Sequence, residues 1–434
     1  MSQPVAVLCA VRGPMEATLV RSMADSRGLE VTRRCADLAE LLAAAAAGLG
    51  RVAVVSGGLP GLDRGAVEHL HASGVWIVVV PDQDRSAENA RMLGVDGVTS
   101  SGAPAPSVVD EVHRVLADAS RGVVPGGGTR GAPEGPAAAR RSRVPTRGTP
   151  ERNGPGEVPG RIVAVWGPTG APGRSTVALT VASEMAELAR RHDAGAVLLV
   201  DADTYGGTLA QLLGLLDEAP GLAAAARAAA GGRLDAAGLA ALTPVLGNGL
   251  RVLTGISRAA RWPEVPSASL DVVWCAAREL AAWTVVDCGF SLEQDEALSY
   301  DTRAPQRNGA TLSALGTADL VLVVGRGDPI GLQRLVRGLG DLDDAGIPAE
   351  RRRVVVNRVR SSANGPRARQ VVRDALRRYA GVDVHVVPDD QPGCDGAVLA
   401  ARTLTEHVPA SPARRALAEL AAEVLSLDVP AGAH

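Results

Sequence analysis

The sequence predicts an α/β protein with two doubly wound parallel sheets joined by a linker. Apolar runs of strand length alternate with helical patterns in residues 1–120 and again in residues 161–434. Such alternation is typical of parallel sheets covered by helices on both faces. Residues 121–160 interrupt it, since 17 of these 40 residues are Gly or Pro. The length of 434 residues leaves room for about two to three domains.

The composition favours a cytoplasmic globular protein. Hydrophobic residues make up 46% of the chain, and the formal net charge of −3 does not favour nucleic-acid binding by the protein as a whole. The five Cys have no metal-ligand spacing, and their odd number without a secretory signal favours reduced thiols. No run of about 18 apolar residues occurs, so we expect no transmembrane segment. All 45 basic residues are Arg, because the chain contains no Lys.

Residues 1–120 are expected to form the first sheet. Their apolar runs are rich in Val, which suits buried strands, and their helical stretches are rich in Ala and Leu. The expected strands are Val5–Cys9, Leu29–Arg33, Arg51–Ser56 and Val75–Val80, and the expected helices are Met15–Ser26, Leu38–Leu49 and Val108–Ala119.

This first domain resembles a response-regulator receiver. The strand ending at Ser56 is followed by a loop containing Pro60, like the receiver phosphorylation loop. The resemblance places Ser56 where the family has its phosphoacceptor Asp, and Ala10–Arg12 where it has an acidic pair. Without these carboxylates the magnesium site of a receiver does not form. We therefore expect an atypical receiver that is not phosphorylated in the usual way, with Ser56 as a plain loop serine.

The linker, residues 121–160, is expected to be disordered. It contains seven Arg and three Glu and too little apolar surface to fold by itself. Its basic charge leaves open a contact with DNA or acidic lipid. A solvated tether is the favoured interpretation.

Residues 161–434 are expected to form the second, larger sheet. Pro220–Leu242 is an alanine-rich helical insert broken at Gly231-Gly232. Ser411–Leu427 is a final helix without the basic face or bulky apolar residues of a membrane anchor, so we expect it to pack on the domain. The expected strands are Arg161–Trp166, Ala196–Val200, Leu250–Leu253, Trp283–Val286, Leu320–Val324, Arg353–Val356 and Val382–Val387.

A glycine-rich stretch, Gly167–Thr176, lies between the strand Arg161–Trp166 and the helical pattern Val177–Ala189. Strand, glycine-rich loop and helix form the setting of a phosphate-binding loop, in which backbone N–H groups and the positive helix end face the anion. Two features depart from the common motif: Arg174 replaces its lysine, and Pro168 replaces its first glycine. A glycine-rich turn without a ligand is the alternative, and the acidic strand ends downstream argue against it.

Carboxylates follow two of the expected strands. Asp201 and Asp203 end the strand after the loop, and Asp287, followed by Gly289, ends a later one. In parallel sheets such strand ends meet at one edge, where ligands bind. Either Asp201 or Asp203 is suited to holding a magnesium-bound water or orienting an attacking one, and Asp287 is suited to binding magnesium through water.

These motifs together resemble the MinD/ParA deviant-Walker ATPases, over about three fifths of the chain. The resemblance implies binding of ATP and Mg²⁺, ATP-dependent homodimerisation, Asp203 as the catalytic aspartate assisted by Asp201, and Gly289 as part of the switch. Asn357 matches an asparagine that contacts adenine, although taken alone it would be a strand-end cap. The implied phosphate loop comprises Gly170, Gly173, Arg174, Ser175 and Thr176, and the implied magnesium ligands are Ser175, Asp201 and Asp287.

One position departs from this family. Its signature lysine, which reaches across the dimer, is replaced here by Thr169. A neutral threonine cannot supply that charge, so we expect slow hydrolysis or a substitute arginine, for which Arg303 and Arg307 are candidates.

The domain order resembles the CpaE/TadZ group, which positions the Flp/Tad pilus secretion machinery and includes proteins described as septum-site-determining. The resemblance implies protein partners in a pilus, secretion or division apparatus, and recruitment through them to the pole or the inner membrane face. The alternatives are a ParA-type DNA-partitioning ATPase, for which DNA is the less favoured partner, and an ATP-bound scaffold that does not hydrolyse.

Overall fold

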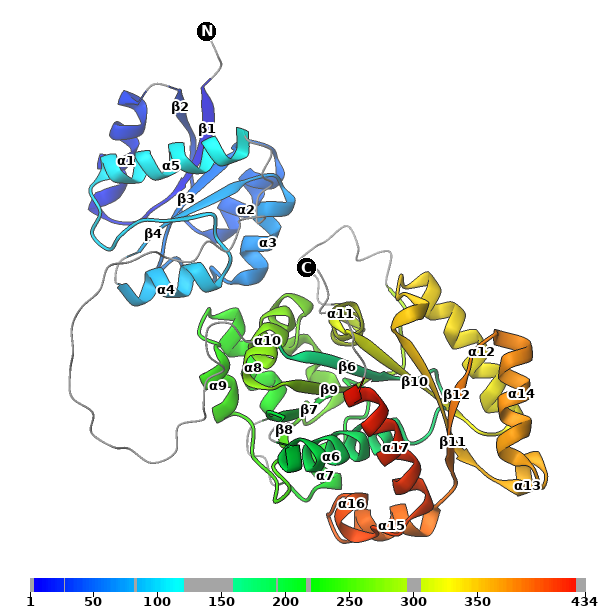
Figure 1. Ribbon diagram of the computed structural model, residues 1–434. Helices are drawn as coiled ribbons and strands as arrows, with labels where there is room; N and C mark the ends of the chain where they lie inside the picture. Colours follow the sequence, from blue (N-terminus) through cyan, green and yellow to red (C-terminus); the bar gives the residue numbers. More distant parts are fainter. Residues whose placement is uncertain are drawn as a thin grey trace, which may run out of the picture. The chain divides into compact units, whose positions relative to one another are not determined.

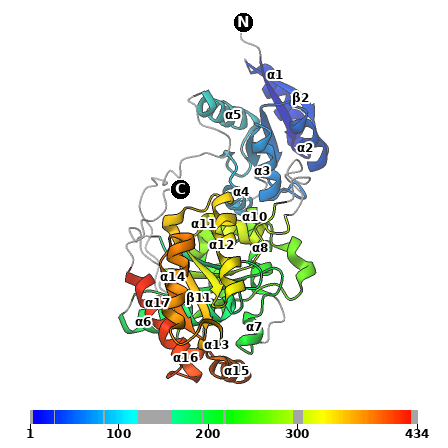
Figure 2. The same cartoon turned by 90° about the vertical axis from the view of Figure 1, so that its right-hand side faces the viewer.

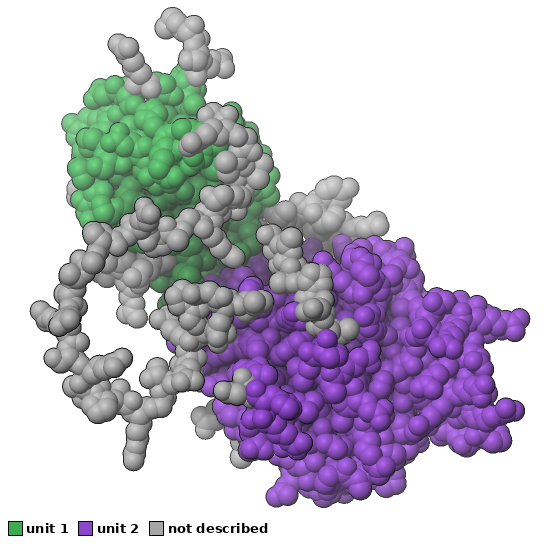
Figure 3. All heavy atoms as spheres, viewed as in Figure 1, with its two compact units in different colours: residues 1–152, 230–233 green, residues 153–229, 234–434 purple. Residues whose placement is uncertain are grey.

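The computed structural model describes residues 4–26, 28–81, 84–120, 159–192, 194–215, 220–294 and 306–426. They form two compact units, coloured separately in Figure 3. Each unit contains one wholly parallel sheet, which confirms the predicted fold class. The predicted disorder of residues 121–160 falls almost entirely outside the described residues.

The smaller unit has a five-stranded sheet in the order β2-β1-β3-β4-β5 (Figure 1). Strands β3 and β4 are buried along their whole length, which explains their unbroken apolar sequence. Helices α1 and α5 pack on one face of the sheet, and α2 and α3 pack on the other. The elements are β1 Val5–Ala10, α1 Pro14–Asp25, β2 Leu29–Arg34, α2 Leu38–Ala46, β3 Val52–Ser56, α3 Arg64–Ala72, β4 Trp76–Val80, α4 Asp84–Met92, β5 Gly97–Val98 and α5 Ala105–Ser120.

At the end of β3, Ser56 is buried, and its hydroxyl accepts a hydrogen bond from the backbone N–H of Arg12 at 3.0 Å. The side chain thus joins the ends of β1 and β3. Its role as a structural loop serine in an atypical receiver stays a prediction.

The larger unit has a seven-stranded sheet in the order β12-β11-β10-β6-β9-β7-β8. The strand that precedes the glycine-rich loop, β6, lies at the centre, so the loop leaves the middle of the sheet. The strands are β6 Arg161–Trp166, β7 Val197–Ala202, β8 Arg251–Leu253, β9 Trp283–Cys288, β10 Leu320–Arg326, β11 Arg352–Val359 and β12 Val384–Pro388.

Helices cover both faces of this sheet, as Figures 1 and 2 show. One face packs mainly on α6 and α17, and the other packs mainly on α8, α10, α11, α12 and α14. The main helices are α6 Arg174–His192, α7 Leu209–Leu212, α8 Gly221–Ala230, α9 Ala236–Ala241, α10 Ser267–Leu280, α11 Gly309–Thr317, α12 Pro329–Asp344, α13 Ser361–Asn364, α14 Ala368–Ala380, α15 Gln391–Leu399, α16 Leu404–His407 and α17 Pro412–Ser426.

Two local expectations are met in this unit. The alanine-rich insert forms α8 and α9, separated at the predicted glycine pair. The final helix, α17, packs on α6, and its Arg414 forms an ion pair with the buried Glu184 at 2.6 Å. In the part of the chain that the structure describes, no helix has the length and apolar character needed to cross a membrane.

A buried ion pair holds the start of β6. The Oδ2 atom of Asp319 accepts hydrogen bonds from the backbone N–H of Ile162 at 2.7 Å and from Arg278 at 2.8 Å. Arg278 also donates to the carbonyl oxygens of Gly160 and Thr317. The Asp319 side chain is 3% exposed, so removing it would leave the guanidinium of Arg278 buried without its counter-charge.

Asp319→Ala should therefore lower the free energy of unfolding of the larger unit by about 3–5 kcal/mol, as expected for the loss of one member of a buried pair. Urea denaturation followed by tryptophan fluorescence measures this unit, because four of the five Trp lie in residues 161–434. The matched control is Asp383→Ala, which removes an exposed pair with Arg377 and should cost about 1 kcal/mol or less. Equal losses in the two variants would contradict the anchoring role of Asp319.

Candidate phosphate-binding site

The loop Gly167–Thr176 connects the carboxyl end of β6 to the first turn of α6. Gly170 and Gly173 have φ angles of 77° and 86°, which side chains rarely adopt. A Cβ atom on Gly173 would lie 2.4 Å from the Nδ2 atom of Asn357. The structure thus explains both glycines by backbone conformation and close approach. Helix α6 begins directly after them, at Arg174, as a phosphate-binding loop requires.

Arg174 is the first residue of α6, and its side chain turns back over the loop. It donates to the carbonyl oxygen of Gly167 at 3.4 Å and lies 3.6 Å from the Oδ2 atom of Asp203. Both contacts are long, and its buried Nε atom has no hydrogen-bond partner among the described residues. A guanidinium that is mostly buried and so weakly bonded is suited to receiving an anion.

Asp201 ends β7 in a fully enclosed position. Its carboxylate accepts hydrogen bonds from the backbone N–H groups of Asp203 and Leu209 at 3.2 and 3.1 Å. Gly207 and Gly255 pack directly against it, because a Cβ atom on either would lie within 3 Å of the carboxylate. Burial raises the pKa of Asp201 to about 7. Asp201 therefore organises the turn after β7, and its oxygens are largely committed to that turn.

Asp203 lies two residues after Asp201, just beyond the end of β7, and faces Arg174. Its Oδ1 atom accepts hydrogen bonds from the backbone N–H groups of Tyr205 and Gly206, while Oδ2 faces Arg174. Gly289 lies against the same carboxylate, since a Cβ atom there would be 3.4 Å from Oδ1. The structure thus brings together three residues that the sequence placed in the site from three different segments: Arg174, Asp203 and Gly289.

Asp287 is the most unusual group of the site. It is the register partner of Asp201 in the β7–β9 pairing and is 1% exposed. Neither of its carboxylate oxygens accepts a hydrogen bond of normal geometry from the described residues. Burial and the nearby Asp201 carboxylate raise the pKa of Asp287 well above its ordinary value, and the Ser175 hydroxyl opposes this rise.

This arrangement fits a hard divalent cation. Magnesium prefers oxygen ligands, and Asp287 offers two carboxylate oxygens without partners, with the Ser175 hydroxyl near enough to affect its pKa. Asp201 is the poorer of the predicted magnesium ligands, because both of its oxygens already accept backbone hydrogen bonds. The assignment of Ser175, Asp201 and Asp287 to magnesium stays a prediction.

Asn357, the predicted adenine contact, reaches the loop itself. It ends the regular part of β11, and its Nδ2 atom donates to the carbonyl oxygen of Pro172 at 3.1 Å. Its Oδ1 atom accepts from the backbone N–H of Arg358, which has a φ angle of 56°. The side chain therefore fixes the loop to β11, and its predicted contact with adenine stays a prediction. Thr176 lies in the first turn of α6 and makes no side-chain hydrogen bond to another described residue, so its predicted role stays a prediction.

Of the two arginines expected to replace the signature lysine, only Arg307 lies within the described residues. Arg307 donates to the Thr204 hydroxyl at 2.8 Å, and its guanidinium stacks 3.6 Å from the Tyr205 ring centre. These contacts commit it to the turn after β7. Arg303 lies outside the described residues. The cation that does reach the loop is Arg334 of α12, which the sequence analysis missed because it is 165 positions away from Thr169.

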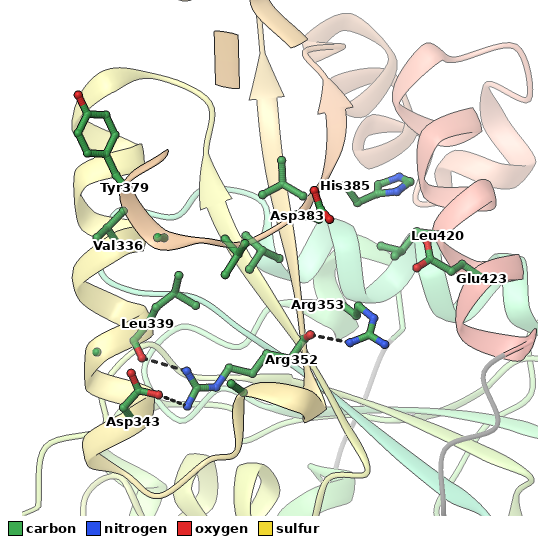
Figure 4. A pocket seen from close by; sticks show the side chains of 16 residues that line it. Val336, Leu339, Asp343, Arg352, Arg353, Tyr379, Asp383, His385, Leu420 and Glu423 are labelled. Carbon is green, nitrogen blue, oxygen red and sulfur yellow. Dashed lines mark hydrogen bonds and ion pairs between the residues drawn. The ribbon is translucent and has the colours of Figure 1, made fainter. Parts of the chain in front are cut away.

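A separate groove of about 780 Å³ lies beside the amino ends of strands β11 and β12 of the same sheet (Figure 4). Arg352 and Arg353 at the start of β11, and His385 of β12, line it together with Leu420 and Glu423 of α17. Because all seven strands are parallel, the amino ends of β11 and β12 lie opposite the edge that carries the loop. The groove is therefore not part of the phosphate site.

Comparisons with solved structures find the same kind of fold. A ParA family ATPase from Chlorobium tepidum TLS matches with a TM-score of 0.50 and 18% identity, over 62% of this chain and 99% of that one. The septum site-determining protein MinD of Pyrococcus horikoshii OT3, solved with Mg-ADP, matches with a TM-score of 0.48 and 19% identity, over 63% of this chain and 99% of that one. No family model and no curated protein matches the chain. The first of these likenesses shows a shared fold.

The raised pKa of Asp287 makes a prediction about stability. The folded state favours the protonated carboxyl, so its contribution to stability is complete below the ordinary aspartate pKa of about 4 and is lost as the pH rises through the folded value. Asp287→Asn stays neutral throughout. It should raise the free energy of unfolding by about 1–3 kcal/mol at about pH 8, with a difference that shrinks toward about pH 4.

Urea denaturation of the nucleotide-free protein across this pH range is the measurement. Asp203→Asn is the matched control, since the Asp203 carboxylate is hydrogen-bonded and faces Arg174, so its removal should not stabilise. If Asp287→Asn were less stable than the parent at about pH 8, the idea that burial of the ionised Asp287 carboxylate destabilises the fold would be wrong.

Proposed function

We propose that this chain is a MinD/ParA-type ATPase that acts as a nucleotide-switched positioning factor. The observation that carries this proposal is that the weakly bonded Arg174, 3.6 Å from Asp203, and the buried Asp287, whose pKa burial raises and the charge of Arg174 lowers, both lie beside a glycine-rich loop. The Arg174 guanidinium would be stabilised by an anion and the Asp287 carboxylate by a cation. Bound Mg·ATP would provide both. The likeness to a ParA family ATPase supports the fold that this activity needs.

In this proposal the loop residues Gly170, Gly173 and Thr176 would cradle the phosphates, and Arg174 would exchange its long contacts for bonds to phosphate oxygens. Ser175 and Asp287 would hold Mg²⁺, which when bound would supply charge neutralisation at the phosphates. Asp203, released from Arg174, orients the attacking water. Burial of Asp201 and Asp287 excludes solvent from the metal side of the site.

We further propose slow turnover of ATP to ADP and phosphate. Thr169 brings no charge to the loop, whereas stabilisation of the negative charge on the phosphoryl group in the transition state requires positioned cations. An ATP-bound dimer that hydrolyses ATP slowly would bind its partners for a period set by the rate of hydrolysis. An ATP-bound scaffold without turnover is the alternative, and it differs from this proposal only in the hydrolysis step.

The cellular role that we propose follows the CpaE/TadZ-like domain order. The smaller unit, as an atypical receiver, would dock a protein of a pilus, secretion or division apparatus. The larger unit would set the dimeric state and so the lifetime of that contact.

The nucleotide switch predicts opposite behaviour for two variants. Arg174→Ala should weaken Mg·ATP binding by at least about 1.5 kcal/mol, roughly tenfold, because a charged hydrogen-bonded contact is lost. Asp203→Ala should keep the affinity and accumulate an ATP-bound dimer, because the step that ends the dimer is slowed. Calorimetry measures the affinity, and light scattering with ATP, ADP and no nucleotide measures the oligomeric state.

The matched control is Arg191→Ala at the far end of the same helix, where the side chain is exposed and paired with Glu187. It should behave as the parent in both measurements. An oligomeric state that is identical with ATP, with ADP and without nucleotide would exclude the switch and leave the scaffold.

A second candidate, ParA-type DNA binding, is favoured by one surface. Arg369, Arg373 and Arg377 follow one another every fourth residue along α14, and all three are exposed. Like charges at this spacing destabilise a helix. Only Arg377 has a carboxylate partner among the described residues, Asp383 at 2.7 Å. Arg369 and Arg373 therefore present positive charge that no described carboxylate neutralises, which suits a phosphate backbone.

If this surface binds DNA, replacing both Arg369 and Arg373 by Ala should weaken ATP-dependent binding to duplex DNA and reduce its salt slope by about one to two. Fluorescence anisotropy at several salt concentrations measures both. The control, Arg190→Ala with Arg191→Ala, removes two arginines already paired with Glu187. DNA affinity that is absent in the parent, or equal in all three proteins, would exclude this candidate.

A further inference from the structure

A second cation lies at the phosphate loop, contributed by a distant helix. The NH1 atom of Arg334 on α12 lies 3.5 Å from the carbonyl oxygen of Thr169. It also rests on Gly170, where a Cβ atom would be only 2.0 Å away. The guanidinium thus occupies the rim of the loop beside the position where the sequence lacks a charge.

The packing of α12 explains this placement. Gly338 lies one helical turn beyond Arg334 and faces the loop, since a Cβ atom there would be 3.1 Å from Pro168 and 3.2 Å from Trp166. The missing side chain lets α12 approach the proline that replaces the first glycine of the motif. Residues four apart lie on one face of a helix, so the same contact directs Arg334 toward the loop.

The remaining donors of Arg334 are available to a ligand. The side chain is exposed, and among the residues that the structure describes it has no carboxylate partner and no hydrogen bond besides the long one to Thr169. An exposed guanidinium without a counter-charge is most often simply hydrated. This one differs because a glycine with a positive φ angle and a close helix contact hold it against a phosphate-type loop.

We propose that Arg334 is a phosphate-contacting residue, which supplies from α12 the charge that Thr169 does not bring to the loop. This inference rests on the proposed function, since it requires a nucleotide in the loop. The planar guanidinium keeps donors for a phosphate oxygen while NH1 stays on the loop backbone. Arg174 and Arg334 then hold the phosphates from two sides.

The test compares Arg334→Ala with Arg334→Lys in the full chain, using Mg·ATP and magnesium triphosphate as probes. Arg334→Ala should bind both about tenfold more weakly, with a smaller dependence of affinity on salt. Arg334→Lys should recover part of the affinity, because it restores the charge without the fork. Arg337→Ala is the matched control: it is exposed on the same helix, three residues on, and should bind as the parent.

The outcomes separate this inference from the proposed function. If the parent binds Mg·ATP and Arg174→Ala loses that binding while Arg334→Ala matches the parent, only the role of Arg334 is overturned. If the parent binds neither probe, the proposed function and this inference fail together. An unchanged unfolding midpoint in Arg334→Ala shows that a loss of affinity arises at the contact itself.

Discussion

The structure of the larger unit depends on the cost of burying two carboxylates side by side. Asp201 and Asp287 are register partners on adjacent strands, and both are almost fully enclosed. Backbone N–H groups satisfy Asp201, whereas Asp287 accepts no hydrogen bond of normal geometry from the described residues and has only the Ser175 hydroxyl nearby. A buried group left in this state destabilises the fold unless a cation or a proton neutralises it. The apolar sheet and the ion pair that anchors β6 give the unit the stability to tolerate it.

The sequence predicted the fold class and most of the strands, because these depend on local patterns, whereas α3, α4 and β5 were not among the expected elements. Strand β6 has the predicted bounds, and Arg174, Asp203 and Gly289 do come together. Strand order is a property of the whole chain, and no local pattern specifies that β9 lies between β6 and β7. That order is what makes Asp287 the neighbour of Asp201.

The same limit explains the arginines. Arg307 lies near the switch in sequence and looked suited to replacing the missing lysine, but it stacks on Tyr205 and bonds Thr204. Arg334 belongs to none of the motifs in the sequence. Only the approach of Gly338 to Pro168 brings it to the loop. Asn357 shows the converse case: its position at a strand end was predicted, but its contact with Pro172 depends on the loop conformation.

If the loop binds phosphate as proposed, a chain without lysine has only guanidinium groups as permanently charged partners for it. A guanidinium is wider than an ammonium and cannot thread into the centre of a tight loop in the same way. The structure accommodates this by turning Arg174 back onto Gly167 and by placing Arg334 at the rim, where space is open on the solvent side. Pro168 and Thr169 then need no charge and little flexibility, because the cations approach from helices on either side. The loop departs from the common motif in its lysine and in its first glycine, and the two departures are linked. The cations, Arg174 and Arg334, lie outside the centre of the loop. Helix α12 packs directly on Pro168, so this position does not need the flexibility of a glycine.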